Sequence, residues 1–321
     1  MTVAISRRDA LAMLGSALTA TLPLRGARAA DLPLLHVSMV PIFVVAPHVV
    51  ADRNGWFAEQ GIAVTTQPVQ SGTIGIPGLT SGSFDILYSN TVAVLTALER
   101  GIDLRIIEQG TKIPVKPPDP AALVQRKGGG MKSGKDLEGK TIGVASKFDI
   151  QWLIAQAWIK QTGGDASKVS YREMPLPSML DALANNQVDA VVAVDPFLTV
   201  GLGDPRFELL AWAQSEVMPG YPSSLWVISS DVAEKKADLI RAYMRGFAKG
   251  AQWVNDHLGD PEYLKLVASF TKTDPTLLAK MVVGPQPMDI DVAGIEHVAA
   301  LMKENGLLKI DIDIAAKIFR S

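Results

Sequence analysis

Cysteine is absent from the 321 residues of the chain. This absence excludes a disulfide framework, a zinc or iron–sulfur site with thiolate ligands, and a thiol nucleophile. Histidine is scarce as well, with only His36, His48, His257 and His297. No two of them stand three or four residues apart, so the sequence gives no support for a metal site, and we expect no metal and no cofactor.

Charge of one sign is also lacking. The chain has 31 basic and 33 acidic residues, a formal net charge of −2, and no basic block. This balance argues against nucleic acid as a partner. Hydrophobic residues make up 48% of the chain and charged residues 20%, which is typical of a folded globular protein. The length suits two domains, or one large one.

Long hydrophobic runs are missing apart from one near the N-terminus. The uncharged stretch 10–24 is too short for a confident membrane span. It follows Arg7-Arg8 and precedes Ala27-Arg28-Ala29, the order of an export signal with a small-x-small cleavage site. We therefore predict a signal peptide over residues 1–30, cleaved near Ala29-Ala30, and a periplasmic protein. The alternative, a buried first helix, is disfavoured because the run shows no 3.6-residue polarity. Residues 6–11 resemble a twin-arginine signal, and general secretory export stays open.

From Leu34 onward, short apolar runs alternate with helical patterns. This rhythm predicts mainly parallel sheets with helices on both faces, an α/β fold. Two proline- and glycine-rich segments, 111–120 and 219–222, interrupt it. We therefore predict two lobes, the first formed by residues 31–111 and 220–321 and the second by the inserted residues 112–219. A ligand cleft is expected between them, at the carboxyl ends of the strands.

The sequence contains no complete motif of an enzyme active site. Residues 129–136 approach the phosphate-binding pattern G-x-x-x-x-G-K-[ST], but Asp136 stands where a hydroxyl is needed for magnesium. Asp149, Asp195 and Asp204 lie at strand ends without a recognisable catalytic partner, so we interpret them as helix caps or hinge contacts. We predict no catalytic residues.

Four segments in order resemble a known family. They are PHVVADRNGWFAEQGIAV (47–64), SGSFDI (81–86), KSGKDLEGKTIGV (132–144), and LDAL (180–183) with QVDA (187–190). They are similar to solute-binding proteins of the nitrate/sulfonate/taurine class of ABC importers, which includes thiamine-precursor pyrimidine binders. Asp195-Pro196 stands where this family often has Glu-Pro. The resemblance implies a two-lobe periplasmic-binding-protein fold of type II, with a membrane permease and its ATPase as partners.

The strand ends that face the expected cleft supply the candidate ligand-binding residues. Phe43 and Phe148 are expected to oppose each other across the cleft, and either could instead be core. Lys112 and Lys147 are the nearest cations, although exposed lysines are commoner than ligand lysines. Hydroxyl and amide groups at helix starts can donate to a ligand or cap the helix. The complete predicted set is Phe43, Ser71, Gly72, Ser89, Asn90, Thr91, Lys112, Ser146, Lys147, Phe148 and Asp195.

The sequence thus predicts capture of a small organic solute, anionic or planar and aromatic, by hinge closure of a monomer. Sulfonate, nitrate, taurine, aromatic carboxylate and pyrimidine ligands all remain open. Two alternatives also remain: an enzyme on the same fold, of the pyrimidine-precursor or menaquinone-route type, and a sensory module that presents its ligand to a receptor.

Overall fold

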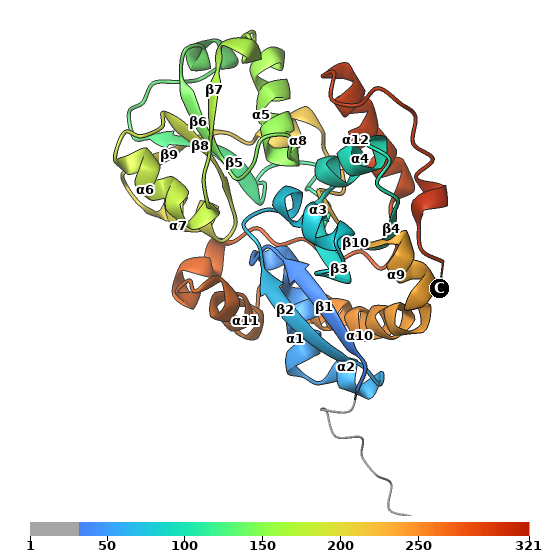
Figure 1. The fold of residues 1–321 in the computed structure, drawn as a ribbon. Coiled ribbons are helices and arrows are strands. Elements are labelled where there is room, and N and C mark those ends of the chain that lie inside the picture. Colours follow the sequence, from blue (N-terminus) through green and yellow to red (C-terminus); the bar gives the residue numbers. More distant parts are fainter. Residues whose placement is uncertain (1–31, 321) are drawn as a thin grey trace, which may run out of the picture. The chain divides into compact units, whose positions relative to one another are not determined.

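The computed structural model describes residues 32–320, which form one compact unit. The predicted signal peptide lies outside these residues. Two five-stranded sheets organise the unit (Figure 1). The first has the order β2-β1-β3-β10-β4 and the second the order β7-β6-β8-β5-β9. The first sheet contains β1 (Leu34–Met39), β2 (Ala63–Pro68), β3 (Ile86–Asn90), β4 (Leu104–Gln109) and β10 (Ser224–Ser229). The second contains β5 (Ala121–Arg126), β6 (Thr141–Val144), β7 (Ser170–Glu173), β8 (Ala190–Val194) and β9 (Phe207–Ala211).

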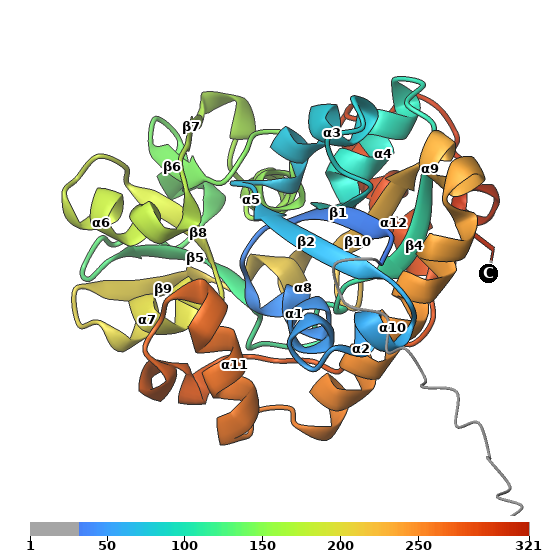
Figure 2. The ribbon, with the colours of Figure 1, turned by 60° about the horizontal axis from the view of Figure 1, so that its bottom comes forward.

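Helices surround both sheets, as Figure 2 shows from a second direction. The α-helices are α1 (Ala46–Arg53), α2 (Trp56–Glu59), α3 (Gly72–Thr80), α4 (Thr91–Glu99), α5 (Ile150–Gln161), α6 (Met179–Ala184), α7 (Phe197–Gly203), α8 (Ala213–Val217), α9 (Ser230–Lys235), α10 (Ala237–Asp256), α11 (Pro261–Thr271) and α12 (Val292–Glu304). Short 3-10 helices are η2 (Phe43–Val45), η3 (Gly134–Leu137), η4 (Ala166–Lys168), η5 (Leu176–Ser178), η6 (Pro275–Lys280) and η7 (Ala315–Lys317). Among residues 32–320, no helix combines the length and apolarity of a membrane crossing.

The alternation read from the sequence corresponds to an α/β fold with one antiparallel strand in each sheet. In the first sheet, β10 runs against both β3 and β4. In the second, β5 runs against both β8 and β9. The remaining strands of each sheet are parallel to one another, as expected for strands joined by crossover helices. These two reversed strands are the ones that begin just after each proline-rich break.

The two chain segments that pass between the sheets lie side by side. Lys112 and Pro222 form an isolated antiparallel bridge, and the amide of Ile113 donates to the carbonyl of Tyr221 at 2.9 Å. A further contact comes from the C-terminal region, where η6 packs against α7 beside the second sheet. The unit is therefore connected by the paired crossing segments and by the α11–η6 region.

Local sequence explains the first sheet's helical layer. The long helix α10 packs against α1, and its Gly250 lies so close to that helix that a Cβ there would stand 2.0 Å from the carbonyl oxygen of Pro47. Helices α9 and α10 are divided at Lys236, whose backbone leaves the helical region. The ammonium group of Lys236 pairs with the buried Asp85 carboxylate at 2.6 Å. After α11, residues Pro275–Lys280 form the 3-10 helix η6 instead of a further α-helix.

Candidate functional site

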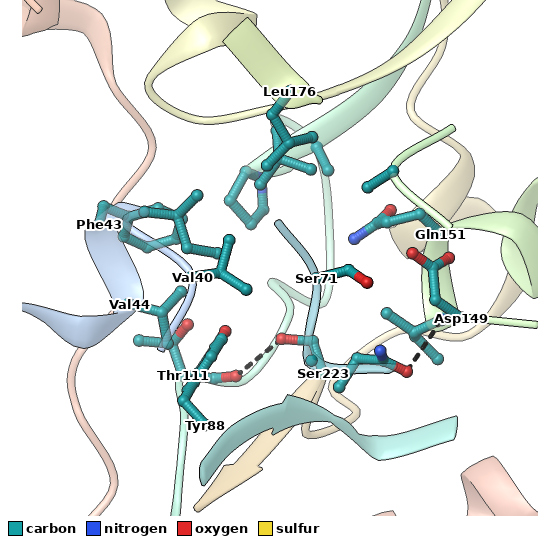
Figure 3. A pocket seen from close by; sticks show the side chains of 18 of the residues that line it. Val40, Phe43, Val44, Ser71, Tyr88, Thr111, Asp149, Gln151, Leu176 and Ser223 are labelled. Atoms are coloured by element: carbon teal, nitrogen blue, oxygen red, sulfur yellow. Dashed lines mark hydrogen bonds between the residues drawn. The ribbon is translucent and has the colours of Figure 1, made fainter. Parts of the chain in front are cut away.

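A cavity lies between the two sheets and receives side chains from both. It encloses about 660 Å³ of empty space, its open mouth included. We call it the central cavity. Figure 3 shows Phe43 and Val44 on one side of it and Asp149 and Gln151 on the other. Its lining comprises Val40, Ile42, Phe43, Val44, Gln70, Ser71, Gly72, Tyr88, Asn90, Thr111, Ile113, Pro120, Ala121, Ala145, Asp149, Ile150, Gln151, Leu176, Val194, Gln214 and Ser223.

Three helix starts converge on the central cavity. Ser71 caps α3 by accepting from the amide of Ile74 at 3.4 Å, and Asn90 caps α4 by accepting from Ala93 at 2.9 Å. Asp149 caps α5 by accepting from the amide of Trp152 at 2.8 Å. Ser, Asn and Asp are preferred at this position because their short side chains reach the unpaired amides of the first turn. The caps therefore place polar side chains at the cavity wall.

Two hydrogen bonds join the walls contributed by the two sheets. Asn90 Oδ1 also accepts from the amide of Ile150 at 3.2 Å. Gln70 Nε2 donates to the carbonyl of Ala145 at 3.5 Å. Asn90 and Gln70 follow strands of the first sheet, whereas Ala145 and Ile150 follow β6 of the second. The cavity is thus enclosed by groups that face each other across the two sheets.

Asp149 is the only carboxylic acid in the described lining of the central cavity, and neither Lys, Arg nor His is part of that lining. Burial raises the pKa of Asp149 to about 7. The hydrogen bonds that its carboxylate accepts from the amides of Trp152, Gln151 and Ser146 lower this pKa, but by less than burial raises it. Burial also raises the pKa of Tyr88 to about 12, so its phenol stays protonated at neutral pH. The remaining polar groups are amides and hydroxyls, and the site is therefore rich in hydrogen-bonding groups and poor in positive charge.

Four of the sequence-predicted residues line the central cavity. They are Phe43, Ser71, Gly72 and Asn90. Phe43 belongs to η2, directly before α1, and is 3% exposed in a cluster of buried apolar residues. Gly72 begins α3 so close to β3 that a Cβ would stand 2.4 Å from the Cα of Ser89. A larger residue at position 72 would therefore push α3 away from the sheet.

Four others of the predicted set lie behind or beside the wall. Ser89 is fully buried under Gly72, and Thr91 Oγ1 donates to the carbonyl of Pro222 at 2.6 Å. Lys112 forms an ion pair with Asp291 at 2.7 Å. Asp195 accepts from the amide and hydroxyl of Thr199 and from the amide of Val282, and burial raises its pKa to about 6. Each of these side chains makes a contact that holds the fold.

The last three predicted residues, Ser146, Lys147 and Phe148, are not part of the described lining of the central cavity. Ser146 Oγ donates to the Lys147 carbonyl at 3.1 Å, and the Lys147 amide donates to Glu173 at 2.7 Å. Phe148 is 51% exposed, and its ring lies tilted against that of Trp152 with the ring centres 4.8 Å apart. Phe148 has a φ of +60°, a left-handed conformation that is unusual for a bulky residue. The next residue, Asp149, faces the cavity.

Several cavity residues were not among the predicted set. Thr111 and Gln70 come shortly after β4 and β2 of the first sheet. Gln214 lies on α8, a helix without a sequence signal, and its amide donates to the Tyr221 hydroxyl at 3.0 Å. Gln151 is the second residue of a helix whose cap was recognisable, so its position could have been inferred from Asp149. Ser223 lies directly before β10, at the end of the segment that passes between the sheets. Its hydroxyl donates to the Thr111 carbonyl at 3.5 Å (Figure 3).

The histidines lie away from the cavity lining. His36 on β1 contacts Thr65 of β2 at 3.0 Å. His48 is buried against Phe57, Trp226 and Tyr243, and burial lowers its pKa to about 3, so its ring is neutral. Within residues 32–320, no three metal-ligating side chains gather in one place.

Comparison with known proteins gives a family and a fold. The family model described as NMT1/THI5 like matches residues 42–260. No curated protein matches the chain significantly. Among solved structures, the chain resembles the periplasmic aliphatic sulphonate binding protein SsuA from Escherichia coli, with 16% identity over 89% of this chain and 97% of that one and a TM-score of 0.72.

Two further solved structures have the same fold. The alkanesulfonate-binding protein SsuA from Xanthomonas axonopodis pv. citri, bound to MOPS, shares 18% identity over 90% of this chain and 98% of that one, with a TM-score of 0.75. The periplasmic nitrate-binding protein NrtA from Synechocystis PCC 6803 shares 12% identity over 89% and 85% of the two chains, with a TM-score of 0.68. The two mixed sheets, with helices on both sides and a cavity between them, are those of the periplasmic-binding-protein fold.

Proposed function

The chain belongs to the NMT1/THI5-like family, and from that premise we propose that it is the solute-binding component of an ABC importer. It captures a small organic solute and delivers it to a membrane permease and its ATPase. The observation that carries this proposal is the central cavity, whose wall is built from both sheets and from three helix starts. The similar structures named for sulfonate and nitrate binding support it.

Hinge closure is the proposed mechanism. Residues 31–111 and 220–321 form one lobe and residues 112–219 the other, with the paired segments around Lys112 and Pro222 as the hinge. A solute that touches both walls gains its full contact energy only when the lobes are closed, so it shifts the equilibrium towards the closed form. Two hydrogen bonds across the cavity support this, because they form only while the walls are close: Asn90 accepts from the Ile150 amide, and Gln70 donates to the Ala145 carbonyl.

The lining favours an uncharged or basic planar solute over an anion. An anionic ligand would face the carboxyl group of Asp149 without a cationic partner among the described lining residues. Burying an unpaired charge is costly, whereas amide and hydroxyl groups such as those of Gln151 and Gln214 can pair with an uncharged polar ring. The rings of Phe43 and Tyr88 offer apolar surface to such a ring. Of the two ligand types expected from the sequence, the planar one suits this cavity better.

A binding role suits the cavity better than catalysis. An enzyme would need a nucleophile or a base with a partner, and Asp149 is engaged as the cap of α5. His36 and His48 lie away from the described cavity lining. We therefore propose a non-catalytic protein without a cofactor. An enzyme on this fold remains the second candidate, and turnover of a bound solute would favour it.

The proposed location is the periplasm, after cleavage of the export signal near Ala29-Ala30. The leader predicts that protein recovered from the periplasm begins at Ala30 or Asp31. Replacing Arg7 and Arg8 with lysines blocks export if the twin-arginine route is used and leaves it unchanged if the general secretory route is used. We propose a monomer that works with a permease. Loss of solute uptake on deleting the chain separates this role from that of a sensory module.

A thermal-shift screen followed by scattering tests the proposal. A solute at 100 times its dissociation constant raises the free energy of unfolding by about 2.7 kcal/mol. The screen should contain uncharged and basic heterocycles beside sulfonates, nitrate and aromatic carboxylates. A hit should also reduce the radius of gyration in solution, because the lobes close on it. If no solute shifts the melting temperature, the binding role is wrong, and a hit with an unchanged radius refutes hinge closure.

A further inference from the structure

A second cavity adjoins the central cavity. It shares the lining residues Val40, Ile42, Gln70 and Leu176 with the central cavity, so the two spaces adjoin at these side chains. Figure 3 shows Val40 and Leu176 among the side chains that line the central cavity. The second cavity encloses about 970 Å³, its open mouth included. We call it the outer chamber. Its remaining lining comprises Pro41, Pro68, Val69, Pro175, Pro177, Phe197, Phe270, Thr271 and Lys272.

The chemistry of the outer chamber differs from that of the central cavity. Four prolines line it, and proline has no backbone N–H, so these positions present apolar surface without donors that a hydrocarbon would leave unpaired. Phe197 and Phe270 add half-buried rings from α7 and α11. The central cavity instead presents Asn90, Gln151 and other amide or hydroxyl groups. One space is therefore suited to a polar group and its neighbour to an apolar one.

Charge also differs between the two spaces. Asp149 is the only charged side chain that lines the central cavity, and Lys272 is the only one that lines the outer chamber, among the described residues. Lys272 is exposed and caps the C-terminal end of α11. Within residues 32–320 it takes part in no recorded ion pair, unlike Lys112, which is held by Asp291. Its ammonium group is thus not held by an ion pair within the described residues.

From this arrangement we propose that the outer chamber is a second subsite and that the solute is elongated. Its uncharged or basic polar head occupies the central cavity, and an apolar tail passes between Val40 and Leu176 into the outer chamber. A tail that ends in a carboxylate gains a further contact with Lys272. The inference rests on the proposed solute-binding function and names the class of solute. Both lobes line the chamber, so the tail also adds to the contacts made on closure.

A graded ligand series tests the subsite. Titration calorimetry with benzamide and with 4-methyl-, 4-propyl- and 4-hexylbenzamide varies the tail while the uncharged head stays constant. Affinity should rise by about fourfold for each methylene buried, until the chamber is filled. Phe270→Ala should reduce the ratio of hexyl to unsubstituted affinity by at least several-fold. Leu277→Ala should keep that ratio, since Leu277 is 51% exposed and lies outside both cavities.

The carboxylate end has its own comparison. A benzamide whose 4-alkyl tail ends in a carboxylate should bind more tightly than the matching alkyl compound, and Lys272→Gln should abolish that difference while retaining the dependence on tail length. If benzamide binds and a longer tail does not increase the affinity, the proposed second subsite is wrong, whereas the solute-binding role stands. Failure of every member to bind overturns the proposed class of solute. Failure of the whole thermal-shift screen is the separate result that removes the solute-binding function.

Discussion

Asn90 holds the start of its own helix and, across the cavity, the start of a helix beside the other sheet. Its Oδ1 accepts from Ala93 of α4 at 2.9 Å and from Ile150 of α5 at 3.2 Å. One acceptor thus serves two otherwise unpaired helix amides. Helix α4 follows β3 of the first sheet and α5 follows β6 of the second. The Asn90 side chain therefore caps its own helix and also holds the two cavity walls together.

Two substitutions of Asn90 separate these roles. Asn90→Ser keeps a good cap for α4 but is too short to reach Ile150, so the free energy of unfolding should stay within about 0.5 kcal/mol of wild type. Asn90→Ala removes both acceptors and should cost about 1–2 kcal/mol. Urea unfolding measures both changes. In scattering without ligand, both variants should have a larger radius of gyration than wild type. Equal radii in all three proteins would contradict a role for Asn90 in holding the walls together.

The caps explain why part of the site could be predicted from the sequence. Ser71, Asn90 and Asp149 each stand between an apolar strand pattern and a helical pattern, where a short polar side chain has a local reason to be. Strand ends of a parallel sheet meet at one edge, so these residues could be expected to converge. The alternation of strand and helix, and the two breaks that precede β5 and β10, are equally local signals.

The rest of the site depends on contacts that are distant in sequence. Lys112 was predicted as a ligand-binding cation, but it forms an ion pair with Asp291. Asp291 is 179 residues away along the chain, so no local sequence pattern indicates this pairing. Phe148 is exposed and has a left-handed backbone, neither of which composition reveals. Gln214 reaches the cavity from α8, a five-residue helix stabilised by its packing on α5 and β5 rather than by its own propensity. Tertiary packing decides each of these positions.

Gly72→Ala tests the close packing of α3 on β3. The added Cβ would stand 2.4 Å from the Cα of Ser89, a backbone atom that cannot yield without moving the strand. We expect a loss of about 1–3 kcal/mol in the free energy of unfolding, together with weaker solute binding because Gly72 lines the cavity. Gly203→Ala is the matched control at the end of α7. A Cβ there meets no atom within 4 Å, so stability should be unchanged or higher by up to about 1 kcal/mol. Equal stabilities would refute the close approach.

Phe148 gives a prediction about backbone conformation. Phe148→Gly and Phe148→Ala both remove the ring contact with Trp152, but only glycine adopts a φ of +60° without strain. The glycine variant should therefore be more stable than the alanine variant by about 1 kcal/mol, measured by urea unfolding. An alanine variant as stable as the glycine one would rule out the left-handed conformation. Unchanged solute affinity in both variants would remove Phe148 from the predicted site.

The last prediction concerns the dependence of stability on pH. Burial raises the pKa of Asp149 from its ordinary value near 3.8 to about 7. Between these values the folded protein holds a proton that the unfolded chain has released, so the free energy of unfolding falls as pH rises. The stabilising effect of this proton is complete below about pH 3.8 and is lost as the pH passes through 7.

Asp149→Asn should flatten this fall. Asparagine can still cap α5 but is uncharged at every pH, so the variant should gain stability relative to wild type between pH 4.5 and 8. One unit of pKa shift corresponds to about 1.4 kcal/mol, and the gain should amount to about 1 kcal/mol or more. Burial also raises the pKa of Asp195 to about 6 and that of Glu108 to about 8, but both groups are common to the two proteins and cancel in the comparison.

Asp165→Asn is the control for this measurement. Asp165 lies on the surface, and its pKa is lowered by the Ser167 hydroxyl and amide, so its titration lies below the measured range. Urea unfolding at half-unit steps of pH should give parallel profiles for wild type and Asp165→Asn. The Asp149→Asn profile should diverge from both above about pH 5. If it ran parallel instead, Asp149 would be ionised throughout the range, and the central cavity would carry a full negative charge when it meets its solute.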